Sequence, residues 1–356
     1  MNTIRFALVG CGRICGKHIE AIHAIEDARL VALCDPDSSK ASAASEKAGG
    51  VPHFDSYDAM LTAVEADVVI ILTPSGLHPQ HTIDIVKKYG KHIVCEKPMA
   101  LRLEDADEMI RVCDTHGVRL FVVKQNRFNL PVQRVREALE AGRFGRLTLG
   151  TVRVRWCRDQ TYYDQADWRG TWNQDGGVIA NQASHHIDLL EWFMGNPVSV
   201  MAINDTFLVD IEADDTCAAL IRFDSGAIGI IEATTATRPI DLEGSLSILG
   251  DKGTAVIGGF AVNELQTWNF ADETAEQRDG ILAEASETPP NVYGYGHQRY
   301  LEHVMECIAT NRRALVDGLE GRKSLELINA IYESAETGRA VSLRFKPKRS
   351  RLGHDS

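Results

Sequence analysis

A lysine between a glutamate and a proline is the first feature of this sequence that could take part in chemistry. The short apolar run His92–Cys95 leads directly into Glu96-Lys97-Pro98, a pattern typical of a strand that enters a tight turn. Lys97 would then lie at the carboxyl end of a strand, where parallel sheets bind their ligands. Pro98 pushes the preceding residue toward an extended conformation, which would aim the ammonium group. Taken alone, the three residues also suit a surface lysine beside a turn.

A second stretch offers a histidine at the start of a helix. Gly176-Gly177 precedes Asn181, His185 and Asp188, and an apolar-periodic run follows. This pattern places His185 in the first turn of a helix, with Asp188 three residues later on nearly the same face. Histidine is the side chain best suited to take a proton from a hydroxyl group near neutral pH. The alternative is a helix start at which Asn181 caps backbone amides and the histidines simply pack.

The elements that must position these residues begin with a glycine-rich turn. The apolar strand 4–9 is followed by Gly10-Cys11-Gly12-Arg13-Ile14-Cys15 and a helix that runs to Ile25. This is G-x-G-x-x-G with a cysteine in place of the last glycine, a pattern that favours dinucleotide phosphates at a helix N-terminus. A second strand, 30–34, ends at Asp35, where a carboxylate would meet ribose hydroxyls. A glycine turn in an unrelated α/β domain is the alternative.

Strands and helices then alternate through the first third of the chain. We expect strands at 67–72, 92–95 and 120–123 and helices at 80–89 and 103–116, with a loop at 73–78. Such alternation predicts a doubly wound parallel sheet. For Thr73 and His78, ordinary turn chemistry explains the loop as well as a ligand contact does.

The pattern changes after a helix at 131–141. Strands follow one another at 147–155, 198–206, 216–223, 227–235 and 242–249, with hairpin turns at 224–226 and 250–253. Helices return at 297–309 and 320–337, and Gly338 ends the last one. We therefore predict a dinucleotide-binding domain over 1–124, a domain with a large, mostly antiparallel open-faced sheet over 125–345, and a disordered tail over 346–356.

Composition limits the class of protein. The chain has 356 residues, 44% hydrophobic and 25% charged, and a net charge of −12, which argues against nucleic acid as a partner. Eight scattered cysteines without a C-x-x-C pair indicate reduced cytoplasmic thiols, neither a disulfide framework nor a metal site. We expect no signal peptide and no membrane span.

Taken together, Val9-Gly10-Cys11-Gly12-Arg13-Ile14, Glu96-Lys97-Pro98 and Gly176-Gly177 with His185 and Asp188 resemble the Gfo/Idh/MocA family of NAD(P)-dependent sugar oxidoreductases. The resemblance covers residues 3 to 345 and implies an active site between the two domains. It places the catalytic lysine at Lys97 and the catalytic histidine at His185. Many members have an aspartate four residues before that histidine, whereas this chain has Asn181, a neutral amide that cannot take up a proton as a carboxylate does.

The stretches 158–163, 168–172, 181–185, 242–245 and 292–297 are similar to a subgroup that oxidises UDP-linked 2-acetamido uronic acids. This implies oxidation of the sugar's 3′-hydroxyl by NAD during surface polysaccharide synthesis, and a homotetramer built through the sheets. We predict that the cofactor is bound by Gly10, Gly12, Arg13, Ile14, Asp35, Thr73, Pro74, Ser75, His78, Glu96, Lys97, Gln125, Trp168 and Arg169. We predict that the substrate is bound by Lys97, Arg127, Arg158, Tyr163, Asn181, Gln182, His185, Tyr295 and His297.

The chemistry needs a base and a cation that steadies a developing oxyanion, and Lys97 and His185 could exchange these roles. Arg127, Arg158 and Arg169 suit anionic groups, although each also suits an ion pair. Two other functions stay open: oxidation of inositol or another free sugar on the same scaffold, and a dinucleotide-sensing regulator. The presence of both Lys97 and His185 argues against the regulator, which needs neither.

Overall fold

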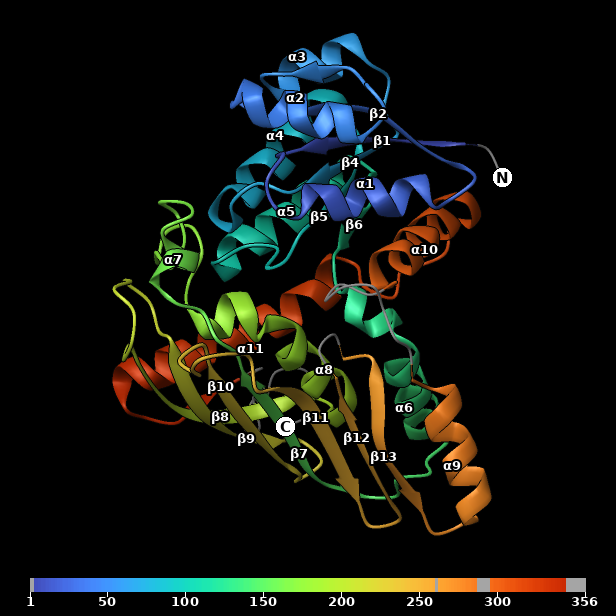
Figure 1. Ribbon diagram of the computed structural model, residues 1–356, viewed down its shortest axis with the longest axis vertical. Helices are drawn as coiled ribbons and strands as arrows, with labels where there is room; N and C mark the ends of the chain where they lie inside the picture. The colour runs from blue at the N-terminus through green and yellow to red at the C-terminus, as the bar shows by residue number, and fades with distance from the viewer. Residues whose placement is uncertain (1–2, 260–261, 287–294, 344–356) are drawn as a thin grey trace, which may run out of the picture.

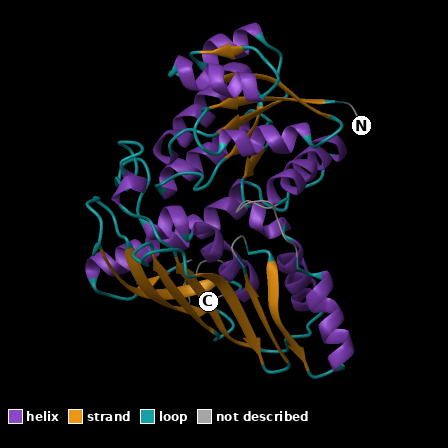
Figure 2. Cartoon of the chain, in the orientation of Figure 1, coloured by secondary structure: helices purple, strands orange, loops and turns teal. Residues whose placement is uncertain are grey.

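Two sheets organise the chain in the computed structural model, which describes residues 3–259, 262–286 and 295–343 (Figures 1 and 2). The first is a six-stranded sheet in the order β3-β2-β1-β4-β5-β6, with all neighbouring strands parallel. Its strands are β1 (Ile4–Val9), β2 (Ala28–Cys34), β3 (His53–Phe54), β4 (Val68–Ile71), β5 (His92–Cys95) and β6 (Leu120–Val122). The predicted doubly wound parallel sheet is confirmed.

Helices cover both faces of this sheet, which is why its central strands are apolar on both sides. All four residues of β4 are fully buried. The covering helices are α1 (Cys15–His23), α2 (Ser38–Lys47), α3 (Tyr57–Ala63), α4 (His78–Tyr89) and α5 (Leu103–Thr115) (Figure 1). The carboxyl ends of β1, β4 and β5 face the second domain, since the residues that follow these strands line one cavity together with residues of that domain.

The second sheet has eight strands in the order β13-β12-β11-β7-β10-β9-β8-β14, and β10 with β7 is its one parallel pair. Its strands are β7 (Leu147–Arg155), β8 (Pro197–Asp205), β9 (Thr216–Phe223), β10 (Ile228–Thr234), β11 (Glu243–Gly250), β12 (Gly253–Gly258), β13 (Glu264–Phe270) and β14 (Val341–Ser342). The mostly antiparallel open-faced sheet is thus confirmed. Strands β12 and β13 and helix α9 (Ala275–Glu284) were not predicted, and the tail 346–356 lies outside the described residues.

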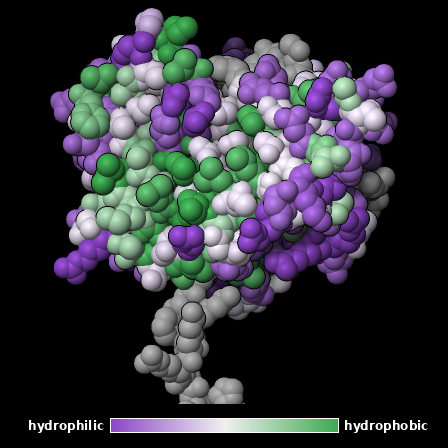
Figure 3. Space-filling view, turned by 90° about the horizontal axis from the view of Figure 1, so that it is seen from below, coloured by the Kyte–Doolittle hydropathy of each residue, from purple (hydrophilic) through white to green (hydrophobic). Residues whose placement is uncertain are grey.

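Residues alternate between the two faces of this sheet. Helices α6 (Leu130–Glu140), α8 (Ser184–Met194) and α11 (Gly318–Thr337) lie on the inner face, and Gly338 ends α11 with φ +64°, as predicted. The outer face carries exposed Met201, Ile203, Leu220 and Ile228. Figure 3 shows apolar side chains gathered on the face seen from below. No helix among the described residues is long and apolar enough to cross a membrane.

One late helix returns to the first domain. Helix α10 (Gly296–Thr310) packs against α1 and buries Tyr300, Leu301 and Val304 in the same core as β1 (Figure 1). A division at residue 124 therefore does not separate the cores of the two domains completely, because residues near 300 complete a core of the first domain.

Candidate active site

Two cavities meet between the domains. The glycine-loop cavity, of about 660 Å³, is lined by the turns that follow β1, β2, β4 and β5 and by residues of the second domain. The sheet cavity, of about 500 Å³, is lined mainly by residues of the second domain. Both are lined by Arg13, Lys97, Gln125, Tyr162, Asn181 and His185. The two catalytic residues expected from the sequence thus lie at the junction of the two cavities.

The glycine turn is shaped by close backbone approach. Gly10 has φ +101°, and a Cβ there would lie 2.9 Å from the carbonyl carbon of Leu72. At Gly12 a Cβ would meet nothing within 4 Å, so the cavity side of the turn is open. The Asp35 carboxylate accepts the Cys11 backbone N–H at 2.8 Å, which fixes it beside the turn. Bare backbone, a helix N-terminus and a carboxylate form the donor and acceptor set that a dinucleotide requires.

A buried histidine ties two loops of the glycine-loop cavity together. Ring nitrogens of His78 lie 2.8 Å from the Pro98 carbonyl oxygen and 2.8 Å from the Thr73 carbonyl oxygen. Burial lowers the pKa of His78, while the two carbonyl oxygens, which can only accept hydrogen bonds, oppose that shift. His78 therefore braces the loop after β4 against the turn that carries Lys97, and both loops line the cavity.

Lys97 is half-buried and faces the second domain. Its Nζ donates to the Asn181 backbone oxygen at 2.9 Å, and its peptide bond with Pro98 is cis. Burial lowers the pKa of Lys97, while the charges of Glu96 and Asp175 oppose that shift. The ammonium group is thus held between the domains, with few compensating charges around it.

His185 stands in the first turn of α8, as the sequence predicts. The Gln125 amide nitrogen lies 3.1 Å from His185 Nε2, and Nδ1 has no partner among the described residues. Burial, followed by the charges of Lys97 and Lys124, holds the pKa of His185 well below its usual value. The imidazole is therefore neutral near pH 7 and has a lone pair that can accept a proton.

Asn181 does not cap the helix, so the alternative in which it caps backbone amides is wrong. It lies in a π-helical turn, Val178–Gln182, and the residue that precedes α8 is Ala183, which makes no side-chain cap. The Asn181 side chain instead donates to the Asp175 carboxylate. A π turn inserted before a helix changes the direction of its side chains, which sequence spacing alone does not reveal.

Behind Lys97, Glu96 joins two histidines from distant segments. Its Oε1 lies 2.8 Å from His18 Nε2 and 3.6 Å from His297 Nε2, and all three residues are buried. One ligand atom from each lies within 4.8 Å of the others, a set that could hold a metal ion. The sequence did not indicate this cluster, because its members come from α1, the end of β5 and α10.

Every residue assigned to cofactor binding lines the glycine-loop cavity. The substrate assignments divide: Arg158 and Gln182 line the sheet cavity, Lys97, Asn181 and His185 line both cavities, and His297 lines the glycine-loop cavity. Three residues, Arg127, Tyr163 and Tyr295, line neither cavity.

Each of these three has a visible reason for its position. Arg127 is buried in ion pairs at 2.8 Å with Asp188 and 3.3 Å with Glu320, so its charge is already compensated. The Tyr163 hydroxyl lies 3.1 Å from Thr235 Oγ1 in the interior, and its neighbour Tyr162 takes the place in the lining. Tyr295 is exposed, and the preceding part of its motif, 292–294, lies outside the described residues.

The cations of the sheet cavity differ in how they are compensated. Arg158 donates to Asp241 at 2.9 Å and lies over the rings of Trp156 and Tyr162. Arg13 makes no ion pair with the described residues and lines both cavities. An incoming anion would therefore meet one uncompensated guanidinium and one that is already paired.

Two neutral side chains of the sheet cavity lack protein partners. Both amide atoms of Gln182 and both ring nitrogens of His186 are buried without a hydrogen bond to the described residues. Burial lowers the pKa of His186 to about 4, so this ring is neutral. Neither His186 nor Tyr162 was predicted from the sequence, because the neighbouring His185 and Tyr163 were assigned to the site instead. Buried polar groups of this kind need partners, which a polar ligand or water would supply.

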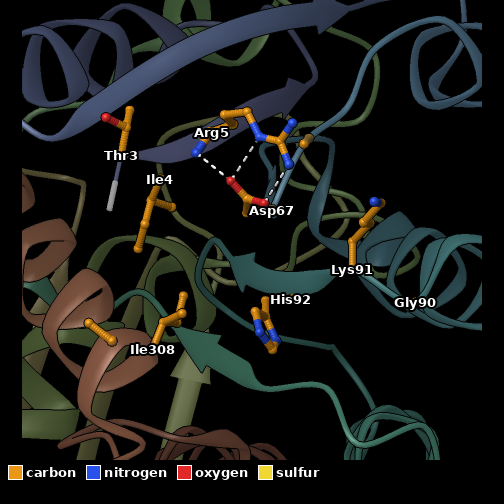
Figure 4. Close-up of a pocket in the computed structure, with 10 residues that line it drawn as sticks. Thr3, Ile4, Arg5, Asp67, Gly90, Lys91, His92 and Ile308 are labelled. Atoms are coloured by element: carbon orange, nitrogen blue, oxygen red, sulfur yellow. Dashed lines mark hydrogen bonds and ion pairs between the residues drawn. The ribbon is translucent and has the colours of Figure 1, made fainter. Parts of the chain in front are cut away.

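Another hollow lies at the opposite end of the parallel sheet. Figure 4 shows it between the amino ends of β1, β4 and β5, where Arg5 forms a bidentate pair with Asp67. The two charges of this pair compensate each other, and Lys97 and His185 are absent from the lining. The chemistry of this molecule therefore belongs to the carboxyl ends of the strands.

Comparison with known proteins agrees with this arrangement. Models of the Gfo/Idh/MocA oxidoreductases match residues 4–124, as the NAD-binding Rossmann fold, and residues 136–343, as the C-terminal alpha/beta domain. The WlbA dehydrogenase from Bordetella pertussis, solved with NADH and UDP-GlcNAcA, is 46% identical over 97% of this chain and 99% of its own, with a TM-score of 0.91.

Two further relatives widen the comparison. The WlbA dehydrogenase from Chromobacterium violaceum, also solved with NADH and UDP-GlcNAcA, is 44% identical over 98% of each chain, with a TM-score of 0.89. Myo-inositol 2-dehydrogenase from Thermotoga maritima is 25% identical over 96% of this chain and 98% of its own length. The similarity thus extends through both domains in each case.

Proposed function

Because the chain belongs to the Gfo/Idh/MocA oxidoreductase family and is an NAD-dependent enzyme, we propose that it oxidises the 3′-hydroxyl of UDP-N-acetyl-2-amino-2-deoxyglucuronate to the ketone. The observation that carries this proposal is the junction of the two cavities at Lys97 and His185. One cavity has the groups for a dinucleotide, and the other has a cation and unpaired polar groups for a second ligand. The two WlbA structures, which hold NADH and UDP-GlcNAcA, support this substrate.

NAD would be held by the backbone of the glycine turn and by Asp35, and when bound it supplies the acceptor for a hydride. Lys97 and His185 line the same cavity as Asp35 and the turn, so they can reach a hydroxyl placed beside that acceptor. Asp35 would accept hydrogen bonds from ribose hydroxyls and would repel a 2′-phosphate. The Asp37 side chain caps α2 instead and adds no second contact there.

Proton removal falls to His185 in this proposal. Its imidazole is neutral near pH 7, and a neutral imidazole can take the hydroxyl proton as the hydride leaves the same carbon. Lys97 donates a hydrogen bond to the oxygen, which gains negative charge as the proton moves away. The Asn181 backbone oxygen holds the ammonium group at 2.9 Å and so fixes its direction.

Recognition of the sugar nucleotide would divide among charged and neutral groups. Arg13 and Arg158 suit the diphosphate and the 6-carboxylate. Gln182 and His186 offer neutral donors and acceptors that suit the N-acetyl group, since an amide presents one donor and one acceptor. Arg158 already has Asp241 as a partner. With a sugar that lacks the carboxylate, the charge of Arg158 would therefore still be partly compensated, unlike that of an unpaired arginine.

The outer face of the eight-stranded sheet is the proposed contact between copies of the chain, in a homotetramer. Exposed Met201, Ile203 and Leu220 form its apolar part, and the Arg155–Glu232 pair, with contacts of 2.7 and 2.8 Å, lies beside them on the same sheet. A mixed face of this kind can bury itself against a second copy. We expect Ile203→Asp to lower the molar mass measured by light scattering, whereas an unchanged mass would place the interface elsewhere.

A cytoplasmic role in surface polysaccharide synthesis completes the proposal. The eight free cysteines of the chain support the cytoplasm. The part in polysaccharide synthesis rests on the resemblance of the sequence to the subgroup that oxidises UDP-linked 2-acetamido uronic acids.

The decisive experiment measures NADH absorbance with purified enzyme, NAD and a panel of alcohols. We expect UDP-N-acetylglucosaminuronate to give a kcat/KM roughly 10²-fold or more above that of UDP-N-acetylglucosamine, which lacks the carboxylate. Similar values for the two sugars would contradict the proposal.

Oxidation of a free polyol is the second candidate. The 25% identity to myo-inositol 2-dehydrogenase along the whole chain favours it, as does the neutral pair Gln182 and His186, which could also bind hydroxyl groups. Faster turnover of myo-inositol than of either sugar nucleotide would establish this alternative.

A further inference from the structure

Asp175 is a buried carboxylate beside the active site that the sequence motifs did not single out. It is 1% exposed and stands just before the glycine pair 176–177. One oxygen accepts the Gly170 backbone N–H at 2.9 Å, and the other accepts the side-chain amide of Asn181. Burial raises the pKa of Asp175, and these two donors oppose that rise. Both oxygens are used as acceptors, as an ionised carboxylate uses them.

This contact fixes which way the Asn181 amide faces. A carboxylate can only accept, so Asn181 must turn its NH₂ group toward Asp175 and its Oδ1 away from it. Oδ1 accepts no hydrogen bond from the residues that the structure describes, and Asn181 lines both cavities. The backbone oxygen of the same residue holds Lys97 at 2.9 Å. Asn181 thus offers an acceptor at the junction while it also orients the lysine.

We propose that Asp175 and Asn181 act as one unit, in which Asp175 is a positioning residue that keeps the Asn181 oxygen directed into the junction, where it can accept a hydrogen bond from a sugar hydroxyl beside the reacting one. The charge of Asp175 lies one hydrogen bond away from the Asn181 amide, whose oxygen is the acceptor that the pair presents to the junction. This inference rests on the proposed roles of Lys97 and His185 but not on the identity of the sugar.

The unit predicts a specific pattern of losses and rescue. In Asp175→Asn, two NH₂ groups would face each other unless Asn181 turned over, and a turned amide would present a donor to the junction. In Asn181→Asp, two carboxylates would face each other. In the double variant, the amide introduced at position 175 would accept from the Gly170 N–H and donate to the carboxylate introduced at position 181. Every hydrogen bond of the wild type would then have an equivalent.

We expect each single variant to lower kcat/KM by roughly 10- to 100-fold, mainly through kcat, and the double variant to recover most of that loss. Asp67→Asn is the matched control, because it makes the same change in a hydrogen-bonded carboxylate at the far end of the sheet (Figure 4). It should retain wild-type kinetics. Thermal melting of each variant separates loss of folding from loss of positioning.

Losses in the double variant that equal the product of the single losses would overturn the proposal, and so would full activity of Asp175→Asn. If Asp175→Asn does not fold, the comparison of Asn181→Asp with the double variant decides, since only a coupled pair gives recovery there. All variants are assayed with UDP-N-acetylglucosaminuronate and with myo-inositol. A wild type that oxidises only myo-inositol would reject the proposed sugar, while rescue measured with myo-inositol would still support the coupled pair.

Discussion

The two cavities are built in different ways. The glycine-loop cavity owes its shape to backbone: a turn at Gly10 that excludes a side chain, a helix N-terminus, and Asp35 held by a backbone N–H. The sheet cavity owes its shape to side chains from several distant segments, including Trp156, His186 and Asp241. A hydrogen bond from a backbone group does not depend on the side chain of that residue, whereas a single substitution can change the groups that line a cavity made by side chains.

This contrast explains what could be predicted. The glycine turn, Asp35 and Lys97 each follow a strand that the alternation of strands and helices predicts. The residues assigned there therefore all line the glycine-loop cavity. Arg127 was chosen because a guanidinium suits an anionic group, and Tyr163 because its segment flanks His185 in the sequence. Neither criterion reveals a partner. Their partners, Asp188 and Thr235, lie 61 and 72 residues away. Asp175 was missed because its role depends on a π turn that the spacing does not show.

The largest expected effect is a loss of kcat in a variant that still binds the cofactor. His185→Asn removes the proposed base and should lower kcat by roughly 10² or more, since general bases contribute about 10²–10⁴. The dissociation constant of NADH, measured by fluorescence titration, should change little. Gln133→Asn, on α6 away from both linings, is the control. An unchanged kcat would move the base role to Lys97.

The role of His185 can also be tested through the pH dependence of kcat/KM. His185 must be neutral to act, and its pKa lies well below the usual value. The midpoint of the acid limb of the kcat/KM profile should therefore lie below pH 6.5. His185→Asn should flatten this limb, and Asn181→Asp should move it upward by stabilising the imidazolium. Rate measurements between pH 4 and 8 decide; a limb that survives in His185→Asn would contradict the assignment.

Substitution of Lys97, which lines both cavities, tests whether this side chain serves the reaction, the binding of the cofactor, or both. Lys97→Met should lower kcat by roughly 10² or more, by analogy with the loss of an oxyanion donor. NADH affinity should stay near that of the wild type, as should the kinetics of the control Lys91→Met at the amino end of β5. Wild-type turnover in Lys97→Met would make the lysine structural only.

Arg158 tests the sheet cavity alone. Because Asp241 already compensates part of its charge, Arg158→Ala should raise the KM of the acidic sugar by about 10-fold and leave the KM of NAD unchanged. It should also narrow the preference over UDP-N-acetylglucosamine. Equal effects on both KM values would show that the two cavities are not separate in function.

Asp35 tests the glycine-loop cavity alone and has the smallest expected effect. Asp35→Ser should reduce the preference for NAD over NADP by severalfold, because a carboxylate would no longer face the 2′-phosphate. The KM of the sugar should not change. Equal efficiency of the wild type with NAD and NADP would refute the assigned role of Asp35.

The return of α10 to the first domain has a consequence for synthesis of the protein. The core around β1 lacks Tyr300, Leu301 and Val304 until those residues have left the ribosome. At about 5–20 residues per second, that interval after residue 124 lasts roughly 10 to 40 s. During this time the surface of α1 that α10 will cover is open to water and to chaperones. A fragment that ends at residue 124 should therefore be recovered mainly in aggregates, and co-expression of a peptide spanning α10 should increase its yield.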